Sequence, residues 1–161
     1  MGHGLSEAYW FLPFVIPIGL YVAYSDLSRM KIPNHSVYAL VAVFAIIGVI
    51  ALPFDIWLWR WPNLVVVLVL GILGNALRLL GAGDAKFMAA AAPFVATSDL
   101  SLMLYIMAAC FAGSYIVHRL AKHSPARRLA PSWESWTSGK RFPMGFPLAA
   151  SLIVYLAVPL F

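Results

Sequence analysis

Two aspartates stand at the ends of strongly apolar stretches, where a carboxylate is costly. Asp26 follows the apolar stretch that starts near Tyr9, and Asp84 lies in the run Gly81-Ala82-Gly83-Asp84-Ala85-Lys86. A charged side chain at the centre of a bilayer costs roughly 2.5 to 3.5 kcal/mol on insertion scales, and less near the surface. Two such residues call for a functional explanation, and they are candidates for one shared catalytic site.

A pair of carboxylates can carry out hydrolysis without any nucleophilic side chain. Two carboxylates held close together cannot both ionise easily, so they share a proton and titrate as a pair. One can act as general base on water while the other, protonated, polarises a peptide carbonyl. No Ser/His/Asp or Cys/His arrangement competes with this reading. The single cysteine and the four histidines show no metal-ligand spacing, so the sequence predicts neither a metal nor another cofactor.

Structural roles are open for both aspartates as well. Asp84 precedes Ala85 and is a favoured N-cap residue for a helix that follows it. Asp26 could pair with Arg29 one turn further on, or with Lys86 from another helix. Residue spacing alone does not decide between these roles and catalysis.

The composition is that of an integral membrane protein. Of the 161 residues, 63% are hydrophobic and only 11% are charged, which is more apolar than a soluble core of this size requires. We therefore predict an all-α, polytopic membrane helix bundle that forms a single domain over residues 1–161. Its six candidate spans are Tyr9 to Tyr24, Val37 to Leu52, Leu64 to Leu80, Ala85 to Thr97, Leu102 to Val117 and Gly145 to Phe161.

The cations follow a membrane topology rather than a nucleic-acid footprint. With the N-terminus outside, the connections 25–36, 81–84 and 118–144 fall inside, and 53–63 and 98–101 fall outside. Ten of the eleven cations then lie on or beside the inner face, and Arg60 alone lies outside, as the positive-inside rule requires. The inner ten are Arg29, Lys31, Arg78, Lys86, Arg119, Lys122, Arg127, Arg128, Lys140 and Arg141. The same topology places Asp26 and Asp84 at one depth near the inner face, without giving a distance between them.

Local signals predict how the first and fourth helices position the aspartates. The first helix can run on through Arg29 and Met30, because Pro33 disfavours helix at the residue before it. Asp26 would then lie about one turn inside the end of that helix. The fourth span is the shortest, and its alanines allow close approach of backbones, so it is expected inside the bundle.

Two aromatic segments have simpler interpretations. Trp57, Trp59 and Trp61 in the outer connection are expected to anchor the chain in the headgroup layer. The inner loop from Arg119 to Arg141 is rich in cations and carries two further tryptophans. Its composition fits a segment that lies on anionic lipid headgroups, with contact to a partner protein as the alternative.

The order of the two aspartate motifs resembles that of the type IV prepilin peptidases. The run Asp26-Leu27-Ser28-Arg29-Met30-Lys31-Ile32-Pro33-Asn34, followed much later by Gly81-Ala82-Gly83-Asp84-Ala85-Lys86, is similar to the family pattern of a first aspartate before an Ile-Pro-Asn turn and a second in a GxGD motif followed by Lys. The resemblance covers at least residues 15 to 95. The run Pro143-Met144-Gly145-Phe146-Pro147 also looks like the family's turn before its last helix.

The resemblance implies an aspartic endopeptidase of the bacterial inner membrane that cuts the short basic leader of prepilins at the cytoplasmic face. Asp26 and Asp84 match the catalytic positions. Gly81 and Gly83 would let a peptide approach Asp84, Lys86 would balance charge or anchor its helix, and Pro33 with Asn34 would form the turn that fixes Asp26. Arg29 is a further supporting residue.

The short form of the chain is similar to the CpaA/TadV peptidases, which process Flp-type pilins and pseudopilins. It has one cysteine and no room for the cysteine-rich domain of the larger members, so N-methyltransferase activity is not expected. The presenilin-like GxGD enzymes have Tyr before their first aspartate, where this chain has Ser25.

Two other functions compete with a peptidase. A small transporter or ion conduit could use intramembrane aspartates to relay protons or bind cations, but the paired inverted halves common in such proteins are missing. An inactive membrane scaffold for pilus assembly would tolerate replacement of both aspartates. The expected partners are a prepilin or pseudopilin substrate and membrane lipids, with no nucleic acid.

Overall fold

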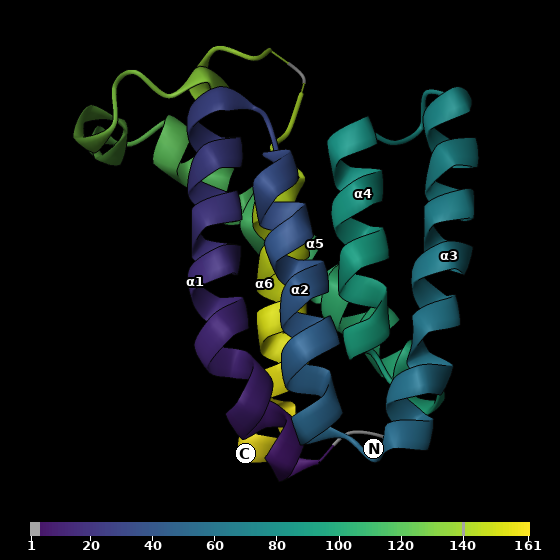
Figure 1. Cartoon of the computed structure of the whole chain (residues 1–161). Helices are drawn as coiled ribbons and strands as arrows, with labels where there is room; N and C mark the ends of the chain where they lie inside the picture. The colour runs from purple at the N-terminus through teal and green to yellow at the C-terminus, as the bar shows by residue number, and fades with distance from the viewer. Residues whose placement is uncertain (1–3, 140) are drawn as a thin grey trace.

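The structure, a computed structural model, describes residues 4–139 and 141–161; Lys140, counted above among the inner cations, lies outside the described residues. The described residues form an all-α bundle in which successive helices run in opposite directions (Figure 1), as the sequence predicted. The α-helices are α1 (Leu5–Arg29), α2 (Asn34–Ala51), α3 (Phe54–Ala76), α4 (Ala82–Ala91), α5 (Leu100–Lys122) and α6 (Gly145–Ala157). Short 3₁₀ turns follow α4 (η1, Ala92–Phe94, and η2, Thr97–Asp99), lie in the α5–α6 loop (η3, Pro125–Leu129, and η4, Glu134–Trp136) and end the chain (η5, Val158–Leu160).

Four of these helices are long and apolar enough to cross a membrane: α1, α2, α3 and the segment Thr97–Lys122 that contains α5. The segment of α6 and η5, Gly145–Leu160, is a shorter apolar helix. Helix α4 has only ten residues, which corresponds to about 15 Å at 1.5 Å per residue. Each of the six predicted spans corresponds to one helix in the structure. Helix α4, which corresponds to the fourth span, is shorter than the roughly 30 Å thickness of the hydrocarbon core.

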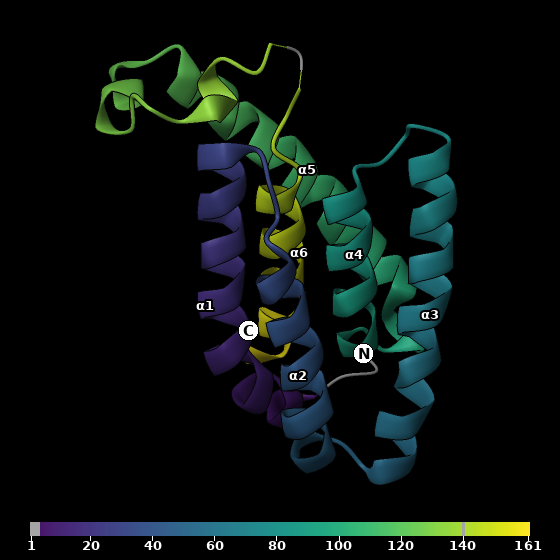
Figure 2. The same ribbon diagram turned by 45° about the horizontal axis from the view of Figure 1, so that its top comes forward.

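The arrangement of the helices brings three helix ends together at one end of the bundle. Helix α1 packs on α2 and α6, and α4 packs on α3, with α2 and α6 between α1 and α4 (Figures 1 and 2). The end of α1 and the starts of α4 and α6 lie at the same end, which we call the site end. Both aspartates lie here, at the end where the α1–α2, α3–α4 and α5–α6 connections also lie.

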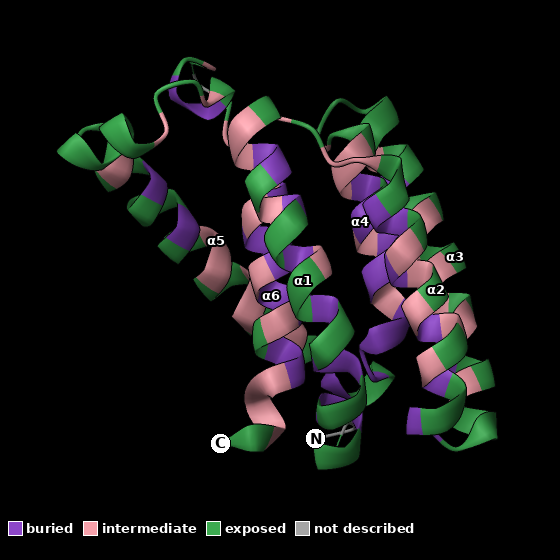
Figure 3. Ribbon diagram, turned by 60° about the vertical axis from the view of Figure 1, so that its left-hand side comes forward, coloured by how far each residue is buried: buried purple, intermediate pink, exposed green. Residues whose placement is uncertain are grey.

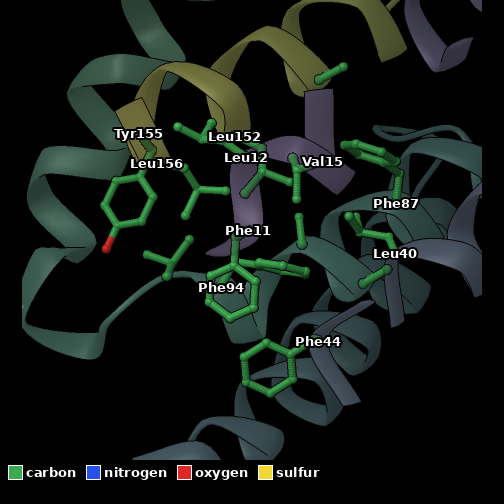
Figure 4. Packing of buried hydrophobic residues seen from close by; sticks show 14 of the residues in the cluster. Phe11, Leu12, Val15, Leu40, Phe44, Phe87, Phe94, Leu152, Tyr155 and Leu156 are labelled. Carbon is green, nitrogen blue, oxygen red and sulfur yellow. The ribbon is translucent and has the colours of Figure 1, made fainter. Parts of the chain in front are cut away.

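The core is centred on Phe94, which comes from the turn after α4. Its ring makes edge contacts with Phe11 of α1 at 4.9 Å and with Phe44 of α2 at 5.3 Å between centroids. Leu152 and Tyr155 of α6 complete this cluster and are almost fully buried (Figure 4). These apolar contacts connect four elements, and they fix the position of the turn that follows α4, at the end of that helix away from Asp84.

The segment predicted as an outer connection, 53–63, is instead helical from Phe54 onward and forms the first turns of α3. Trp57 and Trp61 are half-buried and pack on α2: Trp57 Nε1 donates to the carbonyl of Phe44 at 3.1 Å, and the Trp61 ring meets the Phe44 ring. Trp59 is 78% exposed, as expected for a membrane anchor. In a helix, residues four positions apart share a face, so Trp57 and Trp61 face α2 whereas Trp59 lies on the other side.

A buried polar network holds the other end of the bundle together. Arg60, the predicted lone outer cation, is 4% exposed and pairs with Glu7 of α1 at 2.8 Å. Its guanidinium also donates to the carbonyl of Phe94. The hydroxyl of Tyr155 accepts from the backbone N–H of Ala96 and donates to Asp99, each at 3.1 Å. The network ties α1, α3 and α6 to the chain that follows α4.

The Glu7–Arg60 pair predicts a large effect of removing one partner. Replacing Glu7→Ala removes the carboxylate from a buried ion pair with Arg60, and breaking a buried pair by removal of one partner costs about 3–5 kcal/mol. We expect a clearly lower unfolding temperature for the purified protein in detergent. Glu134→Ala, which removes an exposed loop carboxylate, is the control and should leave the unfolding temperature unchanged. Equal unfolding temperatures for the two variants would contradict the structural role of the pair.

Candidate active site

Asp26 lies in the last full turn of α1, and its position follows from how that helix ends. Helix α1 continues to Arg29, as predicted, and Met30 then adopts a left-handed conformation with φ of 53°. The hydroxyl of Ser25 donates to the carbonyl of Lys31 at 3.0 Å, which holds the turn against the helix. Pro33 follows as the N-cap of α2, and its carbonyl accepts from the Ser36 hydroxyl at 2.7 Å. The Ile-Pro-Asn turn thus fixes the end of α1.

The Asp26 carboxylate is 5% exposed and binds the N-terminus of α6. The backbone N–H of Gly145 donates to Asp26 Oδ2 at 2.6 Å, and the N–H of Phe146 also acts on this carboxylate. The first N–H groups of a helix have no partners within the helix, and they attract anions. Here Pro147 has no N–H, and the N–H of Leu148 already binds the carbonyl of Met144. Asp26 therefore takes both remaining donors of the α6 terminus.

Asp84 lies in the first turn of α4, three residues after the N-cap Gly81. The N-cap role, one of the alternatives left open for Asp84, is excluded because the helix already begins at Ala82. The carboxylate folds back over Gly81, whose N–H acts on it as a donor, and a Cβ at Gly81 would lie 2.5 Å from Asp84 Oδ2. A side chain at position 81 would displace this carboxylate. Unlike Asp26, Asp84 is partly exposed.

The two aspartates come close enough to act on each other electrostatically, although α1 and α4 are separated by α2 and α6. Ile32 joins the two halves of the site. Its side chain lies 3.0 Å from where a Cβ of Gly145 would be, and 3.4 Å from where a Cβ of Gly83 would be. The GxGD motif and the start of α6 therefore both approach the side chain of Ile32. A Cβ at Gly145 would crowd this side chain, whereas a Cβ at Gly83 would make an ordinary van der Waals contact with it.

Lys86 and Arg29 are the remaining predicted site residues. Lys86 does not pair with Asp26, because its Nζ donates to Oδ1 of Asn34 at 3.2 Å and so ties α4 to the start of α2. Arg29 is exposed at the end of α1, and within the described residues no ion pair joins it to Asp26. The described part of the chain holds no group of three His, Cys, Asp or Glu side chains that could bind a metal.

Several residues that shape the site were not predicted from the sequence. Gly145 and Phe146 were noted only as part of a turn, and Ile32 only as the residue before Pro33. Their contacts with Asp26 and with the GxGD glycines cross long sequence separations. The available signal was the spacing of Pro143 and Pro147 around Gly145, which marks a helix start with few backbone donors of its own.

The Lys86–Asn34 bond predicts energetic coupling between the two aspartate motifs. In a double-mutant cycle of Lys86→Met and Asn34→Ala, the free energies of unfolding should be non-additive by about 1 kcal/mol. The control cycle uses Lys31→Met, because Lys31 is exposed in the same turn. That cycle should be additive within about 0.3 kcal/mol. Additivity in the Lys86 cycle would rule out a bond that stabilises the site.

Comparison with known proteins agrees with the motif order. The profile of the Type IV leader peptidase family matches residues 14–117, a range that contains both aspartates, the Ile-Pro-Asn turn and the GxGD motif. No curated protein and no solved structure matches the chain significantly. Because the family match covers more than half of the chain, this protein belongs to the type IV leader peptidase family.

Proposed function

We propose that this protein is an aspartic endopeptidase that removes the leader peptide of Flp-type prepilins or pseudopilins at the cytoplasmic face of the bacterial inner membrane. The observation that carries the proposal is that Asp26 and Asp84 lie at one end of the bundle, close enough to interact electrostatically, on two helices that do not pack on each other. A purely structural role would not need two carboxylates, one buried and one partly exposed, beside the same turn. The family match supports the peptidase reaction itself.

In the proposed reaction, the carboxylate pair holds one proton. The ionised carboxylate removes a proton from water, whose oxygen attacks the scissile carbonyl carbon, while the protonated carboxyl donates its proton to the carbonyl oxygen. The tetrahedral diol then collapses: the carboxyl that gained a proton passes it to the amide nitrogen, the C–N bond breaks, and a diol hydroxyl returns its proton to the other carboxylate. The pair ends in its starting state, and no covalent intermediate forms.

Each surrounding contact has a part in this scheme. The two backbone N–H groups of α6 hold the Asp26 carboxylate in one orientation. Gly81 and Gly83 leave room for an extended peptide beside Asp84. The two motifs are held next to each other by the Lys86–Asn34 hydrogen bond and by Pro33, which follows Ile32 in the turn. Arg29 adds positive charge at the site end.

The proposed orientation rests on the charge distribution. The described cations other than Arg60 lie at the site end, on the connections and helix ends that surround the two aspartates. The positive-inside rule places this end in the cytoplasm and the Glu7–Arg60 end outside. We propose leader cleavage as the reaction of this site.

The central prediction concerns the two carboxylates. Asp26→Asn and Asp84→Asn should each reduce leader removal by about 100-fold or more, because loss of a general acid or base costs about that much. Leader removal is measured by co-expression with a Flp-type prepilin and by the shift in its size on a gel. Asp55→Asn, at the exposed start of α3 at the other end of the bundle, should process normally.

If both Asn variants still process the prepilin, the protein is not an aspartic peptidase. A transporter would instead show ion flux in liposomes that either Asn substitution removes, with no cleavage of the prepilin.

A second prediction tests the support of Asp26 by α6. In Gly145→Ala, the new methyl group would lie 3.0 Å from both Asp26 Oδ2 and the Ile32 side chain, so the carboxylate must shift. We expect a loss of cleavage rate of about 10- to 100-fold, since small displacements of catalytic groups have effects of this size. Gly113→Ala on α5 is the control, because a Cβ there meets nothing within 4 Å. Equal rates for the two variants would show that the contact with α6 is dispensable.

A further inference from the structure

An apolar groove lies between α3, α4 and α5, next to the candidate active site. It has a volume of about 330 Å³ and is open along one side. No charged residue lines it. The walls include Val66 and Leu70 of α3 and Met103 and Leu104 of α5, and the floor includes Met88 and Ala91 of α4. Nothing in the proposed reaction uses these residues.

The groove begins where the active site ends. Residues at i, i+4 and i+7 lie along one face of a helix, and Asp84, Met88 and Ala91 of α4 have this spacing. The last two line the groove. The face of α4 that carries Asp84 therefore continues into the floor of the groove, over about 10 Å from Asp84 to Ala91 at 1.5 Å per residue.

The groove exists because α5 does not pack along α3 and α4. Helix α5 begins beside them at the end away from the site, and it leans away toward the site end (Figures 2 and 3). Its main helical contact is with α6. Consequently Val66 and Leu104, on facing walls, remain 56% and 57% exposed.

The lining is suited to a helix rather than to a polar ligand. Ala91 and Ala92 are small, and small residues let a second helix approach closely within a membrane. Met88, Met103 and Met107 also line the groove, and methionine side chains adapt to surfaces of different shape. The combination of a small floor and adaptable walls fits an apolar helix whose sequence varies.

We propose that this groove docks the apolar helix of the substrate parallel to α4, with the start of that helix beside Asp84. The inference rests on the proposed function, because the bond to be cut in a prepilin lies just before its hydrophobic helix. A helix in the groove would present that bond at the depth of Asp84. A lipid acyl chain could also contact the same lining, but only a segment connected to the scissile bond makes use of the continuity with Asp84.

The test compares two neighbouring valines of α3. Val66 lines the groove, whereas Val65 does not, and the two are almost equally exposed at 56% and 59%. Val66→Trp should lower kcat/KM for a full-length prepilin in proteoliposomes by about tenfold, mainly through KM, because it fills the docking site. Val65→Trp should stay within about twofold of wild type. Equal values for the two variants would overturn the docking proposal.

Crosslinking identifies what occupies the groove. A photoreactive benzoylphenylalanine at Leu104, which lines the groove, should crosslink to the hydrophobic helix of an uncleaved prepilin. The same group at Tyr105, which is exposed and does not line the groove, should crosslink to lipid. Crosslinks to lipid alone from both positions, with normal cleavage, would overturn the docking proposal and leave the peptidase intact. Absence of cleavage by the wild-type protein would instead refute the proposed function, and the docking proposal with it.

Discussion

The contact between the Asp26 carboxylate and the N-terminus of α6 is the constraint on which the site depends. It joins residues 119 positions apart at 2.6 Å in a place where a carboxylate and two free backbone N–H groups would each be costly alone. Pro147 has no N–H, so the Asp26 carboxylate can bind the two N–H groups of the α6 terminus that have no partner within the helix, those of Gly145 and Phe146. The requirement for Gly at 145 follows, since any side chain there would meet both Asp26 and Ile32.

A second constraint acts from the opposite end of the molecule. Helix α4 has only ten residues and does not span the bundle. Contacts of the chain that follows it are therefore needed to fix its position. Arg60 and Tyr155 bind the backbone at Phe94 and Ala96, and the Phe94 ring is buried in the core. These contacts set how deep α4 lies in the bundle. The position of Asp84 is thus determined at both ends of its helix, by the Lys86–Asn34 bond on one side and by the polar network on the other.

Local sequence signals predicted the features that depend on neighbouring residues, namely the helix ends and the helical class of the fold. The extent of α1, its end before Pro33 and the all-α bundle follow from hydropathy, from proline geometry and from the apolar spans. The family was predicted from the order of two motifs. Long-range contacts were not predictable in this way: Glu7 and Arg60 are separated by 53 positions, and nothing near either residue indicates the other. An N-cap role was an open alternative for Asp84 because Asp favours that position, but Gly81 is the N-cap and its backbone N–H acts on the Asp84 carboxylate in the first turn.

The charges at the site end bear on how a substrate can be recognised. In the described chain, this end carries Glu134 and the two catalytic candidates as its acids, against the cations Arg29, Lys31, Arg78, Lys86, Arg119, Lys122, Arg127, Arg128 and Arg141. The basic leader of the proposed substrate would be repelled by this surface, and screening weakens that repulsion only beyond about 8 Å at physiological salt. Under the proposed function, long-range attraction between leader and enzyme therefore does not supply the binding energy. The apolar segment after the proposed cleavage site would supply it instead, and α4 is the element that connects an apolar surface to a carboxylate.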